Sequence, residues 1–449
     1  MPLRRMDLPS DFIKMLSAAY GSEKADEIIA GYSQEIPVSI RLNPKKVPSD
    51  SDIENILDVC KKGYKPVEHC REGLFLDNRP VFTSDPSFQS GCYYVQEASS
   101  MYIGKAMKYV ESKSSLKLLD LCAAPGGKST HWISLLQDFP DSTIVANEVI
   151  NSRAKILCEN MSKWGAANVV VTNNDPSAFG KMEGYFDILA VDAPCSGEGM
   201  FRKDEGAIMD WSLDNVEFCA SRQWRIVSDA WPSLKKGGLL VYSTCTLNEK
   251  EDEGNVKRIV EELGGELLED RKFFPGEPGS GEGFYCAFIR KTSSSDEKAG
   301  HSKKIKKVNS PADSSLLEKI EGNVRLERKG NLVKAYPAAL YDDIKYIESQ
   351  TRVLMSGIAI ATVKEGNNRI YIPEHDFIQS ELYKRGAFAE KEIDAGTSLK
   401  YMRKENISLN DAPKGYIVLL YHDIPLGLVK NLPNRVNNLW PNSRRILSV

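Results

Sequence analysis

Apolar and polar positions follow a regular order between Gly91 and about Arg290, where short apolar runs are separated by amphipathic segments. Apolar residues recur at helical spacing in those segments, which include NSRAKILCENMSKWGA and NVEFCASRQWRIVSDAWPSL. The apolar runs predict strands at Leu116–Leu121, Thr143–Glu148, Val169–Thr172, Asp187–Asp192, Gly238–Ser243 and Phe284–Ile289. Strands that alternate with helices in this way are typical of a doubly wound, mostly parallel α/β sheet.

The chain on either side of this region has a different pattern. The first part mixes amphipathic helix (DFIKMLSAAYGSEKADEIIAGYS) with short strands such as PVSIRLN and GLFLD, and the last part ends in short strands and turns. A Ser- and Lys-rich segment, KTSSSDEKAGHSKKIKKVNSPADSS, has the composition of a linker. We therefore expect an N-terminal α+β region (1–90), the sheet domain (91–291), a flexible linker (292–315), an intermediate domain (316–385) and a C-terminal β-rich module (386–449).

Composition narrows the class of protein without naming a function. The chain has 449 residues, too many for one ordinary domain, and it lacks any apolar run long enough to span a membrane. Nine cysteines without a C-x-x-C pair indicate reduced thiols, and five scattered histidines argue against a metal site. The net charge of −3 disfavours non-specific coating of nucleic acid, although basic residues outnumber acidic ones after Glu321. We expect a cytoplasmic monomer.

The stretch LLDLCAAPGGKSTH, from Leu118 to His131, ends like a phosphate-binding loop. That motif requires a glycine five residues before Gly127, but Cys122 occupies the position, and Pro125 removes one N–H donor. A strand, a small tight turn and a helix opened by two glycines remain. This arrangement suits close approach of the backbone to a nucleoside better than it suits a phosphate cradle.

Acidic and thiol side chains follow the predicted strands. The carboxyl ends of parallel strands form one rim, where doubly wound sheets bind their ligands. Glu148 lies 21 residues beyond Gly127, close to the offset at which an acid binds a ribose hydroxyl. The residues that close or follow the strands are Asp120, Glu148, Asp175, Asp192, Cys195 and Cys245.

Each of these residues alone can have a purely structural role, since an acid after a strand often caps a helix and a single cysteine is usually a small buried hydrophobe. Coincidence accounts poorly for one rim that would hold a glycine turn, a ribose-type acid, two more carboxylates and two thiols. The chain has no G-x-G-x-x-G motif, which disfavours a dinucleotide. A nucleoside-like cofactor such as S-adenosylmethionine fits better.

Three segments carry a resemblance to a known family. LDLCAAPGGK (119–128), DAPCSGEG (192–199) and STCT (243–246) resemble the motifs of the Nop/Sun family of RNA cytosine-5 methyltransferases. YYVQEASSM and PVSIRLNP are similar to the family's entry motif and N-terminal segment, and GYIVLLYHDIPLGLVK with NNLWPNSRR resembles the PUA-like tail of bacterial RsmF-type members. The resemblance implies a Rossmann-like class I methyltransferase domain with a PUA-like RNA-binding module.

The resemblance also implies a role for each matching residue. Cys245 would attack the target cytosine, Cys195 would assist product release, and Asp192 would reach the base. Glu148 would bind the ribose of S-adenosylmethionine, and Asp175 would lie beside the adenine. The cofactor loop would comprise Cys122, Ala123, Ala124, Pro125, Gly126, Gly127 and Lys128, with Asp192 at its border.

These residue types match the chemistry. Carbon 5 of cytosine is a poor nucleophile until a thiolate adds to carbon 6, which is covalent catalysis. A proton-bearing carboxyl at ring N3, here Asp192, would stabilise the developing charge. A free thiol has a pKa of about 8.5, so a nearby cation is needed. The cation candidates are Lys128, Arg202 and Lys203. A Pro-Cys context, as in DNA cytosine methyltransferases, would instead make Cys195 the nucleophile.

The sequence leaves the RNA substrate undecided and allows two alternative classes of protein. The target base must be single-stranded or flipped out. Phe201, Arg202, Lys203 and Trp211 follow Cys195. The two aromatic residues are more typical of packing, whereas we expect the basic pair to contact RNA phosphates. We expect methylation of 16S ribosomal RNA, alone or in the small subunit, with tRNA or 23S rRNA as alternatives. The other classes are a P-loop hydrolase and a non-catalytic ribosome-assembly factor.

Overall fold

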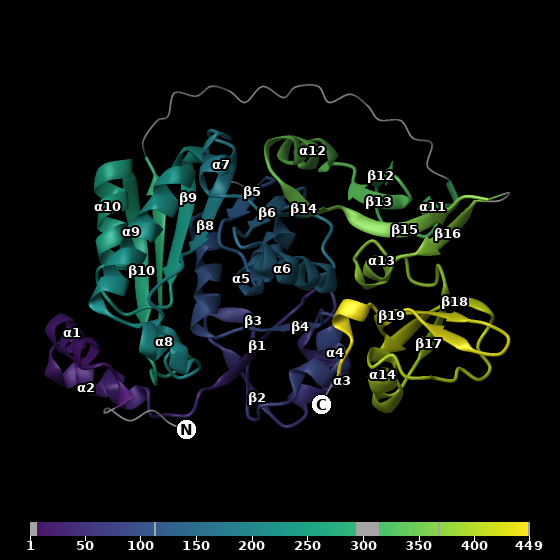
Figure 1. The fold of residues 1–449 in the computed structure, drawn as a ribbon, viewed down its shortest axis with the longest axis horizontal. Coiled ribbons are helices and arrows are strands. Elements are labelled where there is room, and N and C mark those ends of the chain that lie inside the picture. Colours follow the sequence, from purple (N-terminus) through teal and green to yellow (C-terminus); the bar gives the residue numbers. More distant parts are fainter. Residues whose placement is uncertain (1–6, 112–113, 293–313, 367–368, 448–449) are drawn as a thin grey trace.

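The computed structural model describes residues 7–111, 114–292, 314–366 and 369–447. Its centre is an eight-stranded sheet in the order β10-β11-β9-β8-β5-β6-β7-β14 (Figure 1). The strands are β5 (Lys117–Asp120), β6 (Thr143–Asn147), β7 (Val169–Thr172), β8 (Phe186–Asp192), β9 (Leu234–Thr244), β10 (Gly265–Phe273), β11 (Phe284–Lys291) and β14 (Val353–Ser356). Strands β5 to β9 pair in parallel, and the other three are antiparallel to their neighbours. The predicted doubly wound sheet is confirmed.

Helices cover both faces of this sheet, which explains why its strands are apolar at successive positions. On one face, Leu118 and Ile144 pack with α5 (Gly127–Leu135), α6 (Asn151–Trp164) and the 3-10 segment η5 (Ser99–Tyr109). On the other, Leu119 and Val145 pack with α7 (Ser177–Gly180), α9 (Leu213–Ala230) and α10 (Glu253–Leu263). The sequence pattern missed β10 because most of its side chains are exposed or half-buried at the sheet edge.

The N-terminal region forms a separate small sheet in the order β2-β3-β1-β4. Its elements are α1 (Ser10–Tyr20), α2 (Ser22–Gly31), β1 (Val38–Leu42), α3 (Ile53–Ile56), β2 (Tyr64–Val67), β3 (Cys70–Leu76), α4 (Pro86–Gln89) and β4 (Tyr93–Val95), with 3-10 turns at Asp50–Asp52, Asp58–Cys60 and Phe82–Ser84. The long amphipathic segment is two helices, because Gly21 between them has a φ of 78°, in the left-handed region.

Two further four-stranded sheets follow the central domain. The first contains β12 (Val324–Lys329), β13 (Leu332–Pro337), β15 (Ile358–Lys364) and β16 (Ile370–Pro373), and the second β17 (Ala389–Glu392), β18 (Gly415–Tyr421), β19 (Ile424–Asn431) and β20 (Val436–Asn438). The remaining helices are α8 (Glu205–Asp210), α11 (Ser314–Leu317), α12 (Tyr341–Gln350), α13 (His375–Gln379) and α14 (Ala395–Met402), and 3-10 turns lie at Leu136–Asp138, Glu198–Met200, Trp231–Ser233 and Asn442–Arg444. The expected linker falls almost wholly outside the described residues.

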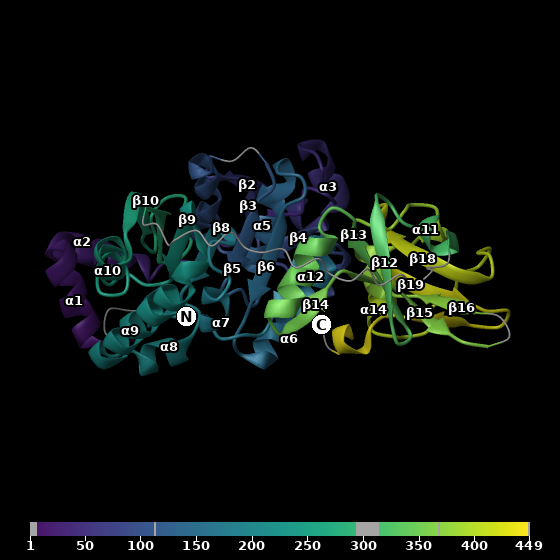
Figure 2. The same ribbon diagram turned by 90° about the horizontal axis from the view of Figure 1, so that it is seen from above.

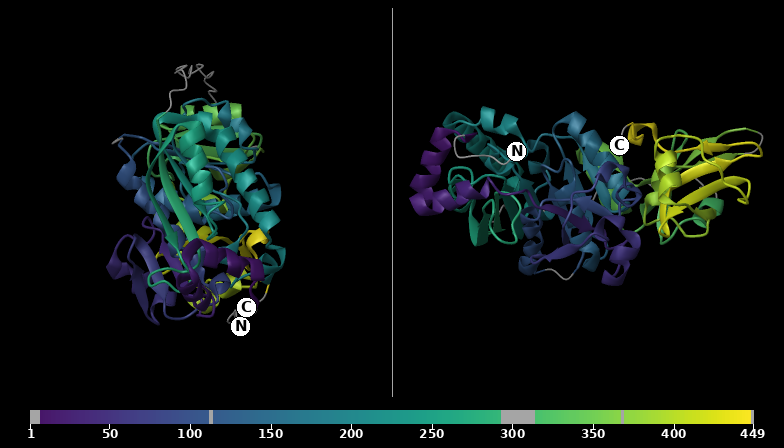
Figure 3. Two further views of the ribbon diagram at one scale, coloured as in Figure 1. Left: turned by 90° about the vertical axis from the view of Figure 1, so that its left-hand side faces the viewer. Right: turned by 90° about the horizontal axis from the view of Figure 1, so that it is seen from below.

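The C-terminal half is tied into the central sheet. Strand β14 pairs with the edge strand β7, and Ile344 and Ile347 of α12 join the apolar cluster on one face of the sheet. Gln379 also donates to the carbonyls of Gln89 and Leu426, which links α13 to the N-terminal region and to β19. The elongated molecule carries α1 and α2 at one end and the last two sheets at the other (Figures 2 and 3). Throughout the described ranges, every helix is too short or too polar to cross a bilayer.

Candidate functional site

The strand order reverses at β5, because β6 and β7 lie on one side of it and β8 and β9 on the other. Doubly wound sheets bind ligands beyond the carboxyl ends of the strands at such a point. The turn after β5 begins at Leu121, and the segments after β8 and β9 contain Cys195 and Cys245. All of the predicted site residues therefore belong to one rim.

The turn between β5 and α5 needs its glycines. Gly126 has a φ of 117°, and a β-carbon there would lie 2.7 Å from the Cε of Met161. In a phosphate-binding loop, the hydroxyl of Ser129 would bind magnesium. Here Ser129 is buried, and its hydroxyl donates to Asp120 at 2.6 Å. Burial raises the pKa of Asp120 to about 7, and the Ser129 hydrogen bond opposes that rise. Because the Ser129 hydroxyl already has a buried hydrogen-bond partner, it is not available to a metal ion, which argues against the P-loop interpretation.

Lys128, the second residue of α5, forms an ion pair across the rim. Its Nζ lies 2.9 Å from Asp192 Oδ2, and the hydroxyl of Ser243 donates to Asp192 Oδ1 at 2.9 Å. Burial lowers the pKa of the Lys128 ammonium, but the negative charges of Asp192 and Cys245 outweigh it and leave the pKa raised. Lys128 is thus a charged group that interacts with both a predicted acid and a predicted nucleophile.

The two thiols meet because β8 and β9 end in register. Asp192 pairs with Ser243, so Cys195, three residues on, and Cys245, two residues on, emerge together. Their sulfur atoms are 3.0 Å apart, and both residues are half-buried. The hydrogen bond with Cys245 raises the pKa of Cys195, and burial, the Cys245 charge and the Glu251 charge add to this effect.

The expected ribose and adenine acids lie after the next two strands. Glu148 is buried, accepts from the Ile150 N–H at 2.8 Å and lies 3.4 Å from Arg153. Asp175 is exposed, caps the Ser177 N–H and pairs with Arg225 at 3.3 Å. These contacts hold both carboxylates on the rim.

Sequence reasoning overlooked several groups at this edge. Val149 and Ile150 are 49% and 44% exposed directly after Glu148, and they place apolar surface beside the ribose-type acid. Asn173 is buried and donates to the carbonyls of Glu148 and Val149, which links the loops after β6 and β7. Exposed valine and isoleucine after a strand look like strand continuation, so the sequence alone carries little signal for this role.

The expectation that Arg202 contacts RNA phosphates is wrong. The Arg202 side chain is only 3% exposed, and its Nε donates to Glu282 at 2.7 Å. Its other N–H groups donate to the carbonyls of Gly31, Gln34 and Gly281. Arg202 therefore joins α2 and the loop before β11 to the Cys195 segment, and its charge is already paired.

The neighbouring aromatic residues are packing residues, as expected. Phe201 and Trp211 lie edge-on to Phe12 of α1, with ring centroids 5.2 and 5.6 Å apart. Both are buried in one apolar cluster with Leu16 and Tyr32. The N-terminal helices thereby support the segment that follows Cys195.

Replacing Arg202 with alanine is expected to lower the free energy of unfolding by about 3–5 kcal/mol, because the buried Glu282 carboxylate would lose its nearest cation and its hydrogen-bond donor. Lys203→Ala is the matched control, since Lys203 is 32% exposed and lies 3.5 Å from the same carboxylate. Its expected cost is about 1 kcal/mol or less. Thermal and urea unfolding of the two variants measure the difference, and equal costs would contradict the structural role of Arg202.

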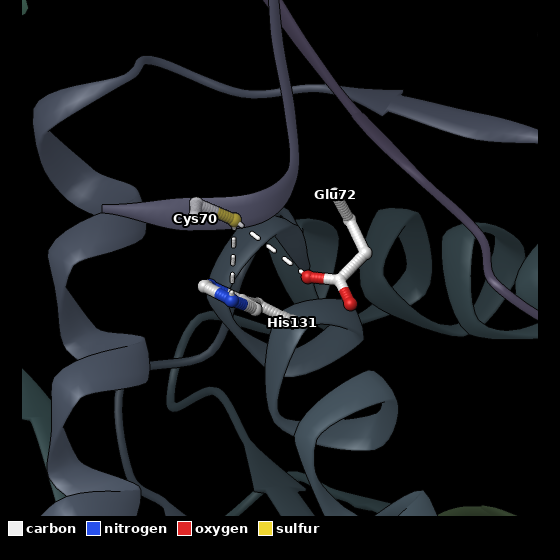
Figure 4. Close-up of side chains that lie close together, drawn as sticks. All are labelled: Cys70, Glu72 and His131. Carbon is white, nitrogen blue, oxygen red and sulfur yellow. Dashed lines mark hydrogen bonds between the residues drawn. The ribbon is translucent and has the colours of Figure 1, made fainter. Parts of the chain in front are cut away.

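A second group of ligand-type side chains lies away from this rim. Cys70 of β3 and His131 of α5 approach to 3.8 Å, and Glu72 lies 3.9 Å from the Cys70 sulfur (Figure 4). The fully buried guanidinium of Arg41 is hydrogen-bonded to neutral acceptors such as Gln96, and its electrostatic partners are Cys70 and Glu72. The buried Arg41 guanidinium disfavours binding of a divalent cation at the same place, because the two positive charges would repel each other. Its charge also accounts for the nearby Cys70 thiol and Glu72 carboxylate.

The sheet order and the rim, with its glycine turn, its acid after the second strand and its paired thiols, define a Rossmann-like methyltransferase. The chain belongs to the RsmB/F family of 16S rRNA methyltransferases. The family model for 16S rRNA methyltransferase RsmB/F matches residues 107–289, the N-terminal domain of RsmF matches 8–98, and the RsmF PUA domain matches 389–446. The resemblance seen in the sequence motifs is confirmed.

Similar proteins extend over nearly the whole chain. Ribosomal RNA small subunit methyltransferase F of Shewanella amazonensis is 30% identical over 453 residues and covers 93% of each chain. The Escherichia coli O139:H28 protein of the same name is 29% identical over 471 residues, with 96% of this chain and 95% of that one covered. A methyltransferase homologue from Pyrococcus horikoshii has a TM-score of 0.55 and 28% identity, with 64% of this chain and 100% of that chain covered.

Proposed function

We propose that this chain methylates carbon 5 of a cytosine in 16S ribosomal RNA with S-adenosylmethionine as the methyl donor. The observation that carries the proposal is the juxtaposition of a thiol pair 3.0 Å apart with the Lys128–Asp192 ion pair. Covalent activation of a pyrimidine needs these groups: a nucleophile, a second proton-handling group, an acid for the ring edge and a cation. Relatives that are named small-subunit rRNA methyltransferases support the substrate.

The rim fits the expected cofactor. Gly126 and Gly127 let the turn pack tightly against Met161 and Tyr94. Glu148 offers a carboxylate for ribose hydroxyls, and the exposed Val149 and Ile150 offer apolar surface for a base. When bound, S-adenosylmethionine supplies an electrophilic methyl group. The turn from Cys122 to Lys128, with Glu148 and Asp175, is the proposed binding surface, and Asp192 borders it.

The proposed reaction starts at Cys245. Its thiolate adds to carbon 6 of the cytosine, forming an S–C bond and moving the C5=C6 electron pair to carbon 5 and the ring. Lys128 is the proposed cation beside the attacking sulfur, since its ammonium interacts with Cys245. The other two cation candidates, Arg202 and Lys203, share Glu282 instead.

Asp192 is proposed to hydrogen-bond to ring N3 of the target cytosine. Binding of the base brings one proton from solvent, which the Asp192 carboxylate and ring N3 share. During the attack this proton moves fully to N3, and the ammonium of Lys128 at 2.9 Å stabilises the carboxylate that remains. The ion pair therefore favours the protonated ring, which is the form that the thiol adduct requires. The Ser243 hydroxyl fixes the other carboxylate oxygen.

The direct test is methyl transfer by the full chain to 16S rRNA and to assembled small subunits, with nucleoside mass spectrometry for 5-methylcytosine. A single modified cytosine in small-subunit RNA is the expected result. Modification of tRNA or 23S rRNA alone would keep the chemistry and overturn the substrate. Binding without any methylation would favour the assembly-factor alternative.

Replacing Asp192 with asparagine is expected to lower kcat by about 10²–10⁴-fold, because an amide neither transfers the proton nor pairs with Lys128. Ser243→Ala is the matched control, since it removes only the hydroxyl that orients the same carboxylate, and it should cost far less. Single-turnover methyl transfer measures both. Equal losses would show that orientation of Asp192, rather than its proton, limits the rate.

A further inference from the structure

Two buried carboxylates that the proposed reaction leaves unused lie beside the thiol pair. Glu198 follows Cys195 by three residues, Glu251 follows Cys245 by six, and neither side chain is exposed. Burial of an ionised carboxylate is costly unless hydrogen bonds satisfy it. Their partners therefore indicate what the two groups do.

Glu251 accepts hydrogen bonds from both segments that carry the cysteines. The Ser196 N–H donates at 3.1 Å, and the Ser196 hydroxyl makes a short bond to the same carboxylate. Asn248 donates at 2.8 Å and Gln223 of α9 at 2.6 Å. All of these partners are donors, so the ionised form of Glu251 satisfies the site best.

Glu198, which follows Cys195, also accepts hydrogen bonds that connect the same two segments. It accepts from the Leu247 N–H at 2.6 Å and from Asn248 and Trp211, both at 2.9 Å. Asn248 thus donates to both carboxylates, which joins the turn after Cys195 to the turn after Cys245. Close backbone approach adds to this, since the Gly199 N–H donates to the Cys245 carbonyl at 2.8 Å.

The charges around the thiol pair are asymmetric. Lys128 interacts with Cys245, whereas the negative charge of Glu251 acts on Cys195 and helps to raise its pKa. Burial raises the pKa of Glu251 itself to about 7, and its bonds from Ser196 and Asn248 oppose that rise. Other titratable groups interact directly with the two cysteines: Tyr32 and Cys219 with Cys245, and Tyr242 with Cys195. Charged groups that act on these neighbours or on Glu198 include Arg222, Asp252 and Lys272.

We propose that Glu251 is a positioning residue that fixes the Cys195 segment against the Cys245 segment and keeps a negative charge beside Cys195. That charge favours the thiol form of Cys195 while Cys245 attacks as the thiolate. Its consequence for turnover rests on the proposed function. The effect of the Glu251 charge on the protonation of Cys195, however, is a property of the folded protein alone and can be measured without RNA.

The measurement is the pH dependence of Cys195 alkylation by iodoacetamide, followed by peptide mass spectrometry in a Cys245→Ser background. This background removes the neighbouring thiol, whose hydrogen bond and charge also act on Cys195. Glu251→Gln removes the negative charge with little change of shape. Because a nearby negative charge favours the protonated thiol, the alkylation midpoint is expected to move down by about one pH unit or more.

Glu249→Gln is the matched control, since Glu249 is exposed on the same turn and should leave the midpoint unchanged. A faster reaction at every pH with an unchanged midpoint would mean that Glu251 only holds the turn in place, which overturns the proposal. If Glu251→Gln does not fold, Gln223→Met serves as the second variant. It removes the 2.6 Å donor, favours neutral Glu251 and should shift the midpoint in the same direction by less, and no shift would overturn the proposal.

Turnover provides the second readout in the chain with both cysteines present. Glu251→Gln is expected to lower kcat about tenfold or more with KM for RNA near that of the wild type, because Glu251 is buried and out of reach of RNA. A higher KM with kcat retained would contradict this role. If the wild type methylates no RNA, the proposed function fails while the alkylation midpoint still decides the field at Cys195.

Discussion

Replacing Cys245 with alanine is expected to reduce methyl transfer by about 10⁴-fold or more, to the background of the assay. The carbon 6 adduct cannot form without a nucleophile, and carbon 5 then stays too unreactive toward a sulfonium methyl group. Cys195 lies 3.0 Å away, but burial and the Glu251 charge still raise the pKa of its thiol when Cys245 is absent. It is therefore a poor substitute for the missing thiolate.

Two measurements define this result. RNA containing 5-fluorocytosine at the target forms a covalent complex that survives denaturing gels, and we expect this complex with the wild type and not with Cys245→Ala. RNA affinity should stay within about threefold, because the alanine removes only one half-buried sulfur atom. Cys158→Ala is the matched control, since Cys158 lies on α6, away from the thiol pair, and should keep full activity. An adduct that persists in Cys245→Ala would assign the nucleophile to Cys195.

The sequence predicted the central sheet well because its strands are buried on both faces. Val169–Thr172 matches β7 at both ends, and Thr143–Glu148 differs from β6 by one residue. Runs of consecutive apolar residues between amphipathic helices are typical of strands that helices cover on both sides. The edge strands β10 and β14 carry a weaker signal. Strand β10 is half-exposed and has several charges, which makes it look like a helix or a loop, and β14 is only four residues long.

The placement of the candidate site residues was predictable as far as strand ends determine it. The parallel register of β8 and β9 follows from the fold, and this register brings Asp192, Cys195 and Cys245 together. The supporting contacts were not predictable, since they join segments far apart in the sequence. Arg202 contacts Gly281 and Glu282 about 80 residues away, and the sequence suggested an exposed cation there. Glu251 stands among other acidic residues in NEKEDE, and no sequence pattern marks this one carboxylate as buried.

Cys195 has a different expected role at each stage of the proposed reaction. While Cys245 is a thiolate, their hydrogen bond and its charge raise the pKa of Cys195. Once the Cys245 sulfur is bonded to carbon 6, both of these influences disappear and Cys195 loses its proton to solvent more readily. Carbon 5 is bonded to carbon 6, so the Cys195 sulfur is close to the proton that must leave after methyl transfer.

Replacing Cys195 with alanine is therefore expected to lower kcat by about 10²–10⁴-fold and to accumulate the protein–RNA adduct. In the wild type, Cys195 accepts the carbon 5 proton, the C5=C6 double bond re-forms, and the S–C6 electron pair returns to Cys245. Without that base, methyl transfer goes forward but release stalls. A denaturing gel with unmodified RNA and the methyl donor should show a stable complex in Cys195→Ala and none in the double variant with Cys245→Ala.

The two cysteine variants thus separate attack from release. Cys219→Ala is the control for Cys195→Ala, because this buried thiol of α9 hydrogen-bonds to Asn215 and should leave release unaffected. If a water molecule removes the carbon 5 proton instead, Cys195→Ala will turn over within a few-fold of the wild type and no adduct will accumulate. If Cys195 is the base, Glu251→Gln should also slow release, but by less than Cys195→Ala, because the Glu251 charge makes the Cys195 thiolate more basic.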